Sequence, residues 1–332
     1  MNVALLQNQL FKQVKERLPS HLSLADELAA LLGISPDSAY RRIRGEKLVD
    51  LGELCAICTH YRIALDPLLG QGGGSFLFHG DLVGSKDLQL PGWLSGMSTQ
   101  LDRIASMKDP VFIFRAEDIP TFHFFQVPEL TKFKLFFWRR TIMNDPAYQN
   151  KRFDLQERDE ELVALARKVH LSYKRLPSIE IWNADSLNAF LRQITYYRDA
   201  GLFKNVEDVT LLFEKLDLLL DHLQAQVETG VKFLMGEPAA TGGASFNVYV
   251  NEVMQGDNMI YAESNGQRMV FVNHSAINYL STTDEVFCAE TRNSIENVIR
   301  KSILISGTGE KERNRYFKAL REEVGRRRAV LV

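Results

Sequence analysis

Residues 23–45, SLADELAALLGISPDSAYRRIRG, predict two short helices joined by a tight turn. The first helix follows Ser23, a residue type that favours the N-cap position, and it stops at Gly33. The second helix carries Pro36 in its first turn, where a missing backbone N–H costs nothing. Two helices connected in this way are typical of the helix-turn-helix unit.

The packing of these two helices makes demands on residue size. A small residue must lie where the helices touch, a glycine must take the turn, and an aliphatic residue must anchor the second helix. We assign these packing roles to Ala29, Gly33, Ala39, Ile43 and Gly45, of which Gly45 ends the second helix.

Helices on either side complete this domain. Residues 4–18 carry apolar side chains on one stripe of an amphipathic helix, and residues 51–69 supply the helix that closes the core. The arrangement over residues 20–69 resembles the Cro and lambda-repressor (XRE) class of helix-turn-helix domains, and within it the BetR-type variant of bacterial regulators. The resemblance covers about a sixth of the chain and implies binding to double-stranded DNA as a two-fold dimer. The sequence departs from the class at Ala39, which is smaller than the usual branched aliphatic, and at Ala25, which replaces a polar phosphate contact.

Charge supports the same interpretation only locally. The chain has 40 Lys and Arg against 42 Asp and Glu, so it has no overall basic excess to attract nucleic acid. Residues 41–47, RRIRGEK, hold four positive residues and one negative residue. The positive charge is therefore concentrated on the second helix of the motif and its exit, where a DNA-reading protein needs it.

The helical repeat of about 100° per residue then separates the roles of individual side chains. The outward-facing residues, which we expect to read bases, are Asp37, Tyr40, Arg41 and Arg44. Arginine suits this role because its guanidinium pairs with guanine O6 and N7 in the major groove. The residues better placed for backbone phosphates are Ser35, Arg42 and Lys47. The alternative is that this segment is a solvated face of a helical protein-interaction adaptor without DNA binding.

A glycine-rich segment divides the chain. Residues 70–75, GQGGGS, have the composition of a flexible linker. We therefore expect an all-α helix-turn-helix domain at 1–69, this linker at 70–75, and a larger α+β region at 76–332. The loop 236–245 offers a point of subdivision within that region.

The larger region mixes the two kinds of periodicity. Residues 111–115 and 122–126 predict strands, and three period-two segments follow residue 246, with the turn SNG at 264–266 between the last two. Predicted helices cover 129–143, 157–170, 184–200, 206–233, 294–305 and 310–325.

Three hypotheses for the larger region follow from these patterns. It forms a small-molecule effector pocket lined by the aromatic residues of 111–138 and the strands after 246, or a platform for a protein partner, or a catalytic domain of unrecognised class. No catalytic motif, metal-ligand spacing or cofactor fingerprint is present, so we expect no enzyme, no metal and no cofactor.

Two weaker motifs have ordinary explanations. Cys55 and Cys58 form a CxxC without a second ligand pair, which favours packing of both cysteines in the helical core over a zinc site. Ser306, Thr308, Lys311 and Arg313 surround a predicted helix start and define a potential anion site. The spacing of a phosphate-binding P-loop is absent there, so a glycine-bearing helix start is the favoured interpretation.

The remaining expectations concern location and assembly. No apolar run is long enough for a signal peptide or a membrane span, and three cysteines argue against a disulfide framework. The sequence therefore predicts a cytoplasmic homodimer without membrane contact, whose partners are double-stranded DNA and a small-molecule or protein effector.

Overall fold

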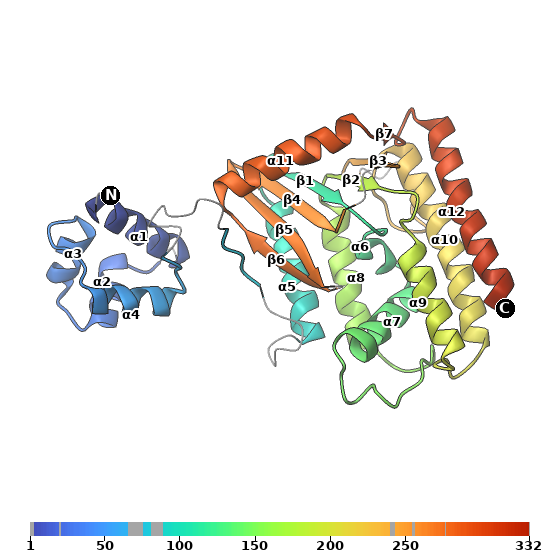
Figure 1. Cartoon of the computed structure of the whole chain (residues 1–332), viewed down its shortest axis with the longest axis horizontal. Helices are drawn as coiled ribbons and strands as arrows, with labels where there is room; N and C mark the ends of the chain where they lie inside the picture. Colours follow the sequence, from blue (N-terminus) through green and yellow to red (C-terminus); the bar gives the residue numbers. More distant parts are fainter. Residues whose placement is uncertain are drawn as a thin grey trace. The chain divides into compact units, whose positions relative to one another are not determined.

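The computed structural model describes residues 3–19, 21–65, 76–80, 89–239, 243–253, 256–275 and 277–331. The chain divides into two compact units, Met1–Leu77 and Phe78–Val332, and each is described by itself (Figure 1). The predicted linker at 70–75 lies outside the described residues. The loop 236–245 lies within the second unit, between its longest helix and a strand of its sheet.

The smaller unit contains four helices, α1 Val3–Arg17, α2 Leu24–Leu32, α3 Pro36–Ile43 and α4 Leu51–Tyr61, and no strand among its described residues. Their apolar faces meet in one core that includes Phe11, Leu28 and Ile57. α4 begins with a capping box in which Asp50 accepts from the backbone of Glu53 while the Glu53 carboxylate accepts from the backbone of Asp50. Caps and a shared apolar core therefore define the ends and the packing of these short helices.

The larger unit is built on a seven-stranded sheet with the order β6-β5-β4-β1-β2-β3-β7. Its strands are β1 Val111–Arg115, β2 Ser178–Trp182, β3 Phe246–Val250, β4 Met259–Ser264, β5 Gln267–Ser275, β6 Asn278–Thr282 and β7 Ile303–Leu304. β1, β2 and β3 run parallel in the centre. β4, β5, β6 and β7 run antiparallel to their neighbours.

Helices connect the parallel strands. Between β1 and β2 lie α6 Thr121–Phe124, α7 Pro128–Phe137, the π-helix η1 Trp138–Ile142 and α8 Glu160–Lys174. Between β2 and β3 lie α9 Asn188–Asp199 and α10 Glu207–Thr229, while α5 Leu90–Ala105 precedes the sheet and α11 Glu285–Arg300 and α12 Glu310–Leu331 close the chain. Parallel neighbours require such crossovers, because a tight turn cannot return the chain to the same edge.

The fold class expected from the sequence, an all-α domain joined to an α+β region, is wrong. The structure is a mixed α/β arrangement built on one seven-stranded mixed sheet. Along the chain, helices alternate with the three parallel strands of this sheet. The error has two sources. β2 is a five-residue strand that the sequence analysis did not identify, and parallel pairing joins segments far apart in the chain, which local periodicity cannot reveal.

Local predictions in this unit had mixed outcomes. The strand at 111–115 and the hairpin at 264–266 are confirmed, and Asn265 and Gly266 both adopt positive φ, as a two-residue turn of this kind requires. The strand predicted at 122–126 is wrong, because this segment begins as helix α6. Its aromatic residues are buried, and continuous burial does not distinguish a strand from a short buried helix.

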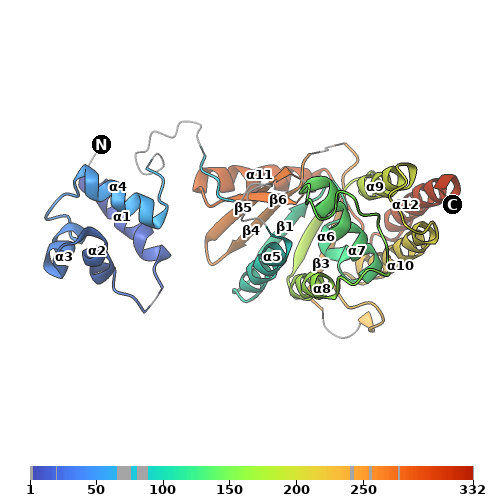
Figure 2. The same ribbon diagram turned by 90° about the horizontal axis from the view of Figure 1, so that it is seen from below.

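The two faces of the sheet are covered differently. Phe112 and Phe114 face the large core that α5–α10 and α12 form, whereas Ile113 faces a smaller core with α11. Figure 2 shows the sheet between α11 on one side and α5 and α8 on the other. Alternation along β1 therefore assigns neighbouring residues to two separate cores.

Polar side chains of β2 and of the segments packed against it form a buried cluster. We call Glu180, His123, Tyr173, Trp182 and Lys232 the Glu180 cluster. The Glu180 carboxylate lies 2.9 Å from His123 Nε2, accepts from Trp182 Nε1 at 2.7 Å, and also accepts from the Tyr173 hydroxyl. Lys232 Nζ donates to the carbonyls of Tyr173 and Leu176 at 3.2 and 2.8 Å. Each charged group of the cluster therefore has hydrogen-bond partners within the protein, which buried charges require.

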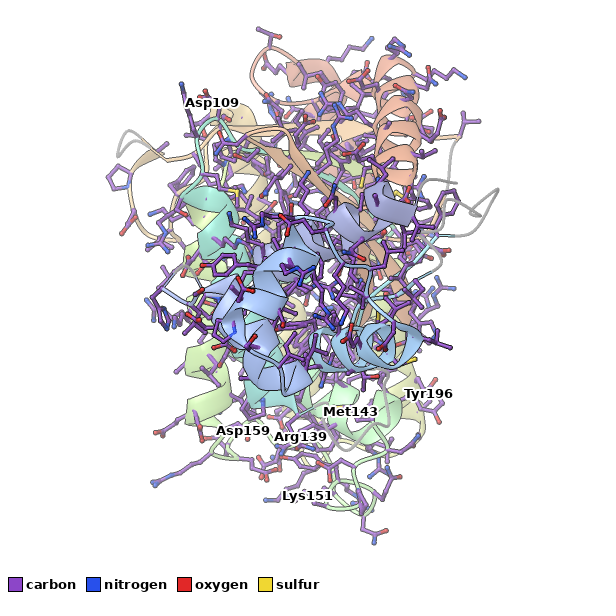
Figure 3. The ribbon with its side chains drawn as sticks, turned by 90° about the vertical axis from the view of Figure 1, so that its left-hand side faces the viewer. Asp109, Arg139, Met143, Lys151, Asp159 and Tyr196 are labelled. Atoms are coloured by element: carbon purple, nitrogen blue, oxygen red, sulfur yellow. The ribbon has the colours of Figure 1, made fainter. Side chains whose placement is uncertain are left out.

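The loop between η1 and α8 is fastened by an arginine of η1. Arg139 pairs with Asp145 at 3.5 Å and with Asp159 at 3.8 Å, and its guanidinium lies 4.2 Å from the centre of the Tyr148 ring. Figure 3 shows Arg139 and Asp159 together at this end of the unit. These contacts support η1, whose first residue, Trp138, lines the cavity described below.

Candidate functional site

α2 and α3 are joined by a short turn that glycine and caps define. Gly33 has a φ of +64°, and its N–H donates to the carbonyl of Ala29 at the end of α2. Ser35 caps α3, since its hydroxyl accepts from the backbone of Ser38 at 3.2 Å. Ser35, which the sequence assigned to a phosphate, is exposed and already has this structural role.

The packing residues lie at the interface of these helices. Ala39 is fully buried, Ala29 is buried, and Ile43 packs against the same core while remaining partly exposed. Gly45 has a φ of +77°, a left-handed conformation that glycine adopts without strain, just after α3.

The outer face of α3 exposes the side chains predicted to read bases. Tyr40 is 50% exposed, and the side chains of Arg41 and Arg44 are 54% and 59% exposed. Asp37 and Lys47 are exposed as well. Exposed aromatic and guanidinium groups on one short helix form a surface that can contact base edges and phosphates.

An acidic residue lies beside these arginines. Glu46 lies 3.1 Å from Arg44 Nε and 3.9 Å from Arg41 Nε. Exposed ion pairs contribute little free energy, typically about 0–1 kcal/mol, so either arginine can exchange Glu46 for a stronger anion. Glu46 nevertheless reduces the local positive charge below what the count of basic residues suggests.

The assignment of Arg42 to a phosphate contact is wrong. Its side chain is 4% exposed and makes a two-point pair with the Glu53 carboxylate, with 2.8 Å between Nε and Oε2. A third bond runs from Arg42 Nη1 to the carbonyl of Ser38 at 3.0 Å. The hydrogen bonds to Glu53 raise the pKa of Arg42 above its ordinary value. Arg42 therefore joins α3 to α4 and is withdrawn from the surface.

Gln7 is a residue of this site that the sequence analysis missed. Its side-chain nitrogen donates to the carbonyls of Arg42 and Lys47 at 2.7 and 2.9 Å, and its oxygen accepts from Val49 at 2.8 Å. The buried amide therefore clamps the chain that leaves α3 onto α1. The available signal was a polar residue within the apolar stripe of the first helix.

The two cysteines of the CxxC differ in environment. Cys58 packs against the core of the smaller unit, but Cys55 is exposed, so the prediction that both are buried is wrong for Cys55. The described residues contain no group of three or more His, Cys, Asp or Glu side chains able to hold a metal ion.

The potential anion site is not assembled. Ser306 is buried, and its hydroxyl accepts from the backbone of Val248 at 2.8 Å. The buried Arg313 donates to the carbonyls of Ile305 and Gly307 at 3.0 and 2.9 Å. Thr308 and Lys311 are exposed. Two of the four residues thus secure the loop before α12, so the anion prediction is replaced by a structural role.

A cavity of about 630 Å³ lies in the larger unit, between α5 and the β4–β6 half of the sheet; we call it the α5 cavity. Its aromatic wall comes from Trp93, Phe112, Phe114, Phe122, Trp138, Phe271 and Tyr279. Its volume falls within the range of about 300–1,000 Å³ that is usual for small-molecule sites. The position agrees with the pocket expected from the aromatic residues of 111–138 and the strands after 246, although α5 was not identified from the sequence.

Two charged groups line the α5 cavity without forming an ion pair with each other. Lys134 is 9% exposed and points among aromatic rings, with its ammonium 4.2 Å from the centre of Phe124 and 5.0 Å from that of Phe190. Burial lowers the pKa of Lys134 to about 8. Burial likewise raises the pKa of Asp118 to about 6, and this carboxylate accepts a 3.4 Å bond from Ala189.

Several buried polar atoms of the cavity lining lack a hydrogen-bond partner in the described part of the chain. They are Thr121 Oγ1, Gln193 Oε1 and Asn278 Nδ2. Buried polar groups are nearly always hydrogen-bonded, because an unpaired group loses its hydration without compensation. Unpartnered donors and acceptors around an apolar cavity therefore indicate a place where a ligand or solvent completes the hydrogen bonding.

The start of the larger unit forms part of the cavity lining. His79 exchanges two 2.8 Å backbone hydrogen bonds with Ser281 of β6, and His79 and Gly80 both line the cavity. A Cβ added to Gly80 would lie 3.0 Å from the carbonyl oxygen of Tyr279. The chain thus passes close along β6 only a few residues after the 70–75 segment.

Comparisons with known proteins add no relative. No family model matches the chain, and no curated protein and no solved structure is similar to it. Among the described residues, no helix has both the length and the apolar character that crossing a membrane demands. The two features of the molecule that bear on its function are the outer face of α3 and the α5 cavity.

Proposed function

We propose that this protein is a sequence-specific regulator of transcription that binds double-stranded DNA through α3 and a small-molecule effector in its larger unit. The observation that carries the first half is the outer face of α3. Tyr40, Arg41 and Arg44 are exposed there on a helix whose ends are held by caps. The α5 cavity supports the second half.

The support for α3 extends to how rigidly the helix is held. Gln7 and Arg42 tie it to α1 and α4 through buried hydrogen bonds. A recognition helix must keep its orientation while its side chains contact bases, because a shift of the helix would displace every contact. A dimer would double the number of base pairs read, so we expect two copies on a two-fold symmetric site.

The alternative is a helical adaptor that uses the same face to bind an acidic protein. Exposed arginines and a tyrosine also suit a protein interface. The salt dependence and the sequence preference of binding separate the two, because only a DNA reader discriminates among duplexes of the same length and charge.

The test is fluorescence anisotropy with labelled duplexes from the promoter region of the protein's own gene, across a salt series. We expect the wild type to bind with a steep salt slope, and Arg41→Ala plus Arg44→Ala to lose sequence preference. Each arginine that pairs with guanine contributes about 1–3 kcal/mol of discrimination. The matched control is Lys12→Ala plus Lys15→Ala, which removes the same charge from exposed positions on α1.

Loss of preference in the arginine variant alone supports the proposal. Equal losses in both variants would attribute binding to net charge and contradict base reading by α3. If the wild type binds neither this DNA nor a random-sequence pool beyond weak non-specific association, the adaptor alternative replaces the proposal.

A further inference from the structure

We propose that the α5 cavity binds an amphipathic carboxylate, with its anionic end at Lys134 and its apolar body against α5 and the aromatic wall. The role of this ligand as effector rests on the proposed function, whereas the site itself rests on the geometry of the larger unit.

Lys134 has an environment that is incomplete without a ligand. Its ammonium carries three donors, and within the described residues it meets aromatic rings but no hydrogen-bond acceptor and no ion-pair partner. Cation–π contacts compensate only part of the hydration that burial removes. An anionic oxygen from a ligand supplies the acceptor that the protein lacks.

Other polar groups of the same cavity lining can make further contacts with the ligand. The Asn278 side chain is 4% exposed, and its amide nitrogen has no partner, so it can donate to a carboxylate or carbonyl oxygen. Thr121 Oγ1 also lacks a partner and can donate or accept. Asp118 opposes a second negative charge, and this restricts the ligand to a single anionic group.

The rest of the lining requires an apolar body. Trp93, Met97, Leu101 and Ile104 occupy one stripe of α5 and line the cavity. Phe112, Phe114 and Ile260 line the sheet side of the same cavity. A cavity of about 630 Å³ with this lining gains hydrophobic stabilisation from an extended or ring-bearing hydrocarbon, which a small inorganic anion does not provide.

The three tryptophans of the chain provide the readout. Trp93 and Trp138 both line the α5 cavity, and their rings lie 5.5 Å apart. The probe is 11-(dansylamino)undecanoic acid, a fluorescent carboxylate whose dansyl group accepts energy from tryptophan. The full chain is titrated without DNA, so this result does not depend on whether the protein binds DNA.

We expect saturable energy transfer in the wild type. Dodecanoate should displace the probe at a concentration at least about tenfold below that of dodecan-1-ol, which has the same chain length without the charge. Lys134→Met should weaken the probe at least about tenfold, whereas Lys168→Met, at an exposed position on α8, should leave its affinity unchanged. A tenfold change corresponds to about 1.4 kcal/mol, a modest value for a charge-assisted hydrogen bond.

Three results would overturn the inference. They are absence of saturable transfer in the wild type, equal displacement by dodecan-1-ol and dodecanoate, and unchanged probe affinity in a folded Lys134→Met variant. The comparison of alcohol and acid uses the wild type alone, so it remains decisive if the lysine variant fails to fold. A protein that binds the probe but no DNA would uphold the site while contradicting the proposed function.

Discussion

The Glu180 cluster and the α5 cavity contain two buried lysines with opposite surroundings. Lys232 is 2% exposed, donates to two backbone carbonyls and lies 3.4 Å from the centre of the Tyr173 ring. Lys134 is 9% exposed and contacts rings without an acceptor. Burial alone therefore does not distinguish a structural lysine from one that we propose to bind a ligand. The distinguishing feature is whether the protein itself supplies hydrogen-bond acceptors to the ammonium group.

Burial lowers the pKa of both lysines, and a carboxylate opposes the shift in each region, Asp118 for Lys134 and Glu180 for Lys232. Burial lowers the pKa of Lys232 to about 7, and the Glu180 carboxylate opposes this shift. Burial would raise the pKa of Glu180, yet His123, Lys232 and Tyr173 together hold it below its ordinary value. The two lysines therefore differ in their acceptors, because Lys232 donates to two carbonyls whereas Lys134 has no acceptor among the described residues. Substitutions in each region should have opposite consequences.

The largest effect is expected for Lys232→Met. The variant leaves two buried carbonyls without their donor and the buried Glu180 carboxylate without a nearby positive charge. Removing the partner of buried polar and charged groups in this way costs about 3–5 kcal/mol of unfolding free energy. Urea unfolding followed by tryptophan fluorescence measures it, and reports only the larger unit because Trp93, Trp138 and Trp182 all lie there. A loss below about 1 kcal/mol would show that Lys232 is not structurally required.

An intermediate effect is expected on acidification, through His170 beside the Glu180 cluster. Burial lowers the pKa of His170 to about 3, and its ring nitrogen lies 2.9 Å from the carbonyl oxygen of Phe122. The unfolded chain takes up this proton below about pH 6.5, but the folded chain does not. The stability of the larger unit is therefore complete above that pH and declines toward about pH 3, by at most about 1.4 kcal/mol per pH unit for this histidine.

The measurement is the unfolding free energy of the wild type and of His170→Phe between pH 7 and pH 5. The variant should show a shallower decline, while His274→Phe, at an exposed histidine, should match the wild type. Equal slopes in all three proteins would remove His170 as the source of acid sensitivity. In the α5 cavity, Lys134 stays protonated throughout this range, whereas Asp118, whose pKa burial raises to about 6, takes up a proton within it.

The smallest effect on stability is expected for Lys134→Met, and it has the opposite sign to that of Lys232→Met. Removing a buried cation without an acceptor relieves its desolvation cost, so the free energy of unfolding should be unchanged or higher by up to about 1 kcal/mol. The same urea experiment measures it. A loss comparable to that of Lys232→Met would make the two lysines equivalent and abolish the comparison.

Much of the local structure followed from the sequence. Caps, glycines and apolar stripes predicted α2, α3 and the outward position of Tyr40, Arg41 and Arg44, because these features depend on residues within one or two helical turns. Period-two alternation likewise predicted β1 and the β4–β5 hairpin. The order of the strands was not predictable, since it depends on pairings between distant segments.

The errors in the site have a similar cause. Arg42 and Arg44 are chemically alike and close in the chain, but only Arg42 meets a carboxylate of α4 that removes it from the surface. Arg313 has the residue type of an anion ligand, but its Nη1 donates to two backbone carbonyls of the loop before α12. The role of a charged side chain is decided by its partners, and partners from distant segments are not visible in a local pattern.

The sequence by itself determined the turn between α2 and α3, the exposed face of α3 and the aromatic character of 111–138, because residue type and spacing suffice for these. Only the tertiary structure decided that Lys134 faces a cavity while Lys232 lies in a closed polar cluster. The physical reason is that the free energy of a buried charge depends on the acceptors around it, and those come from strands and helices that folding brings together.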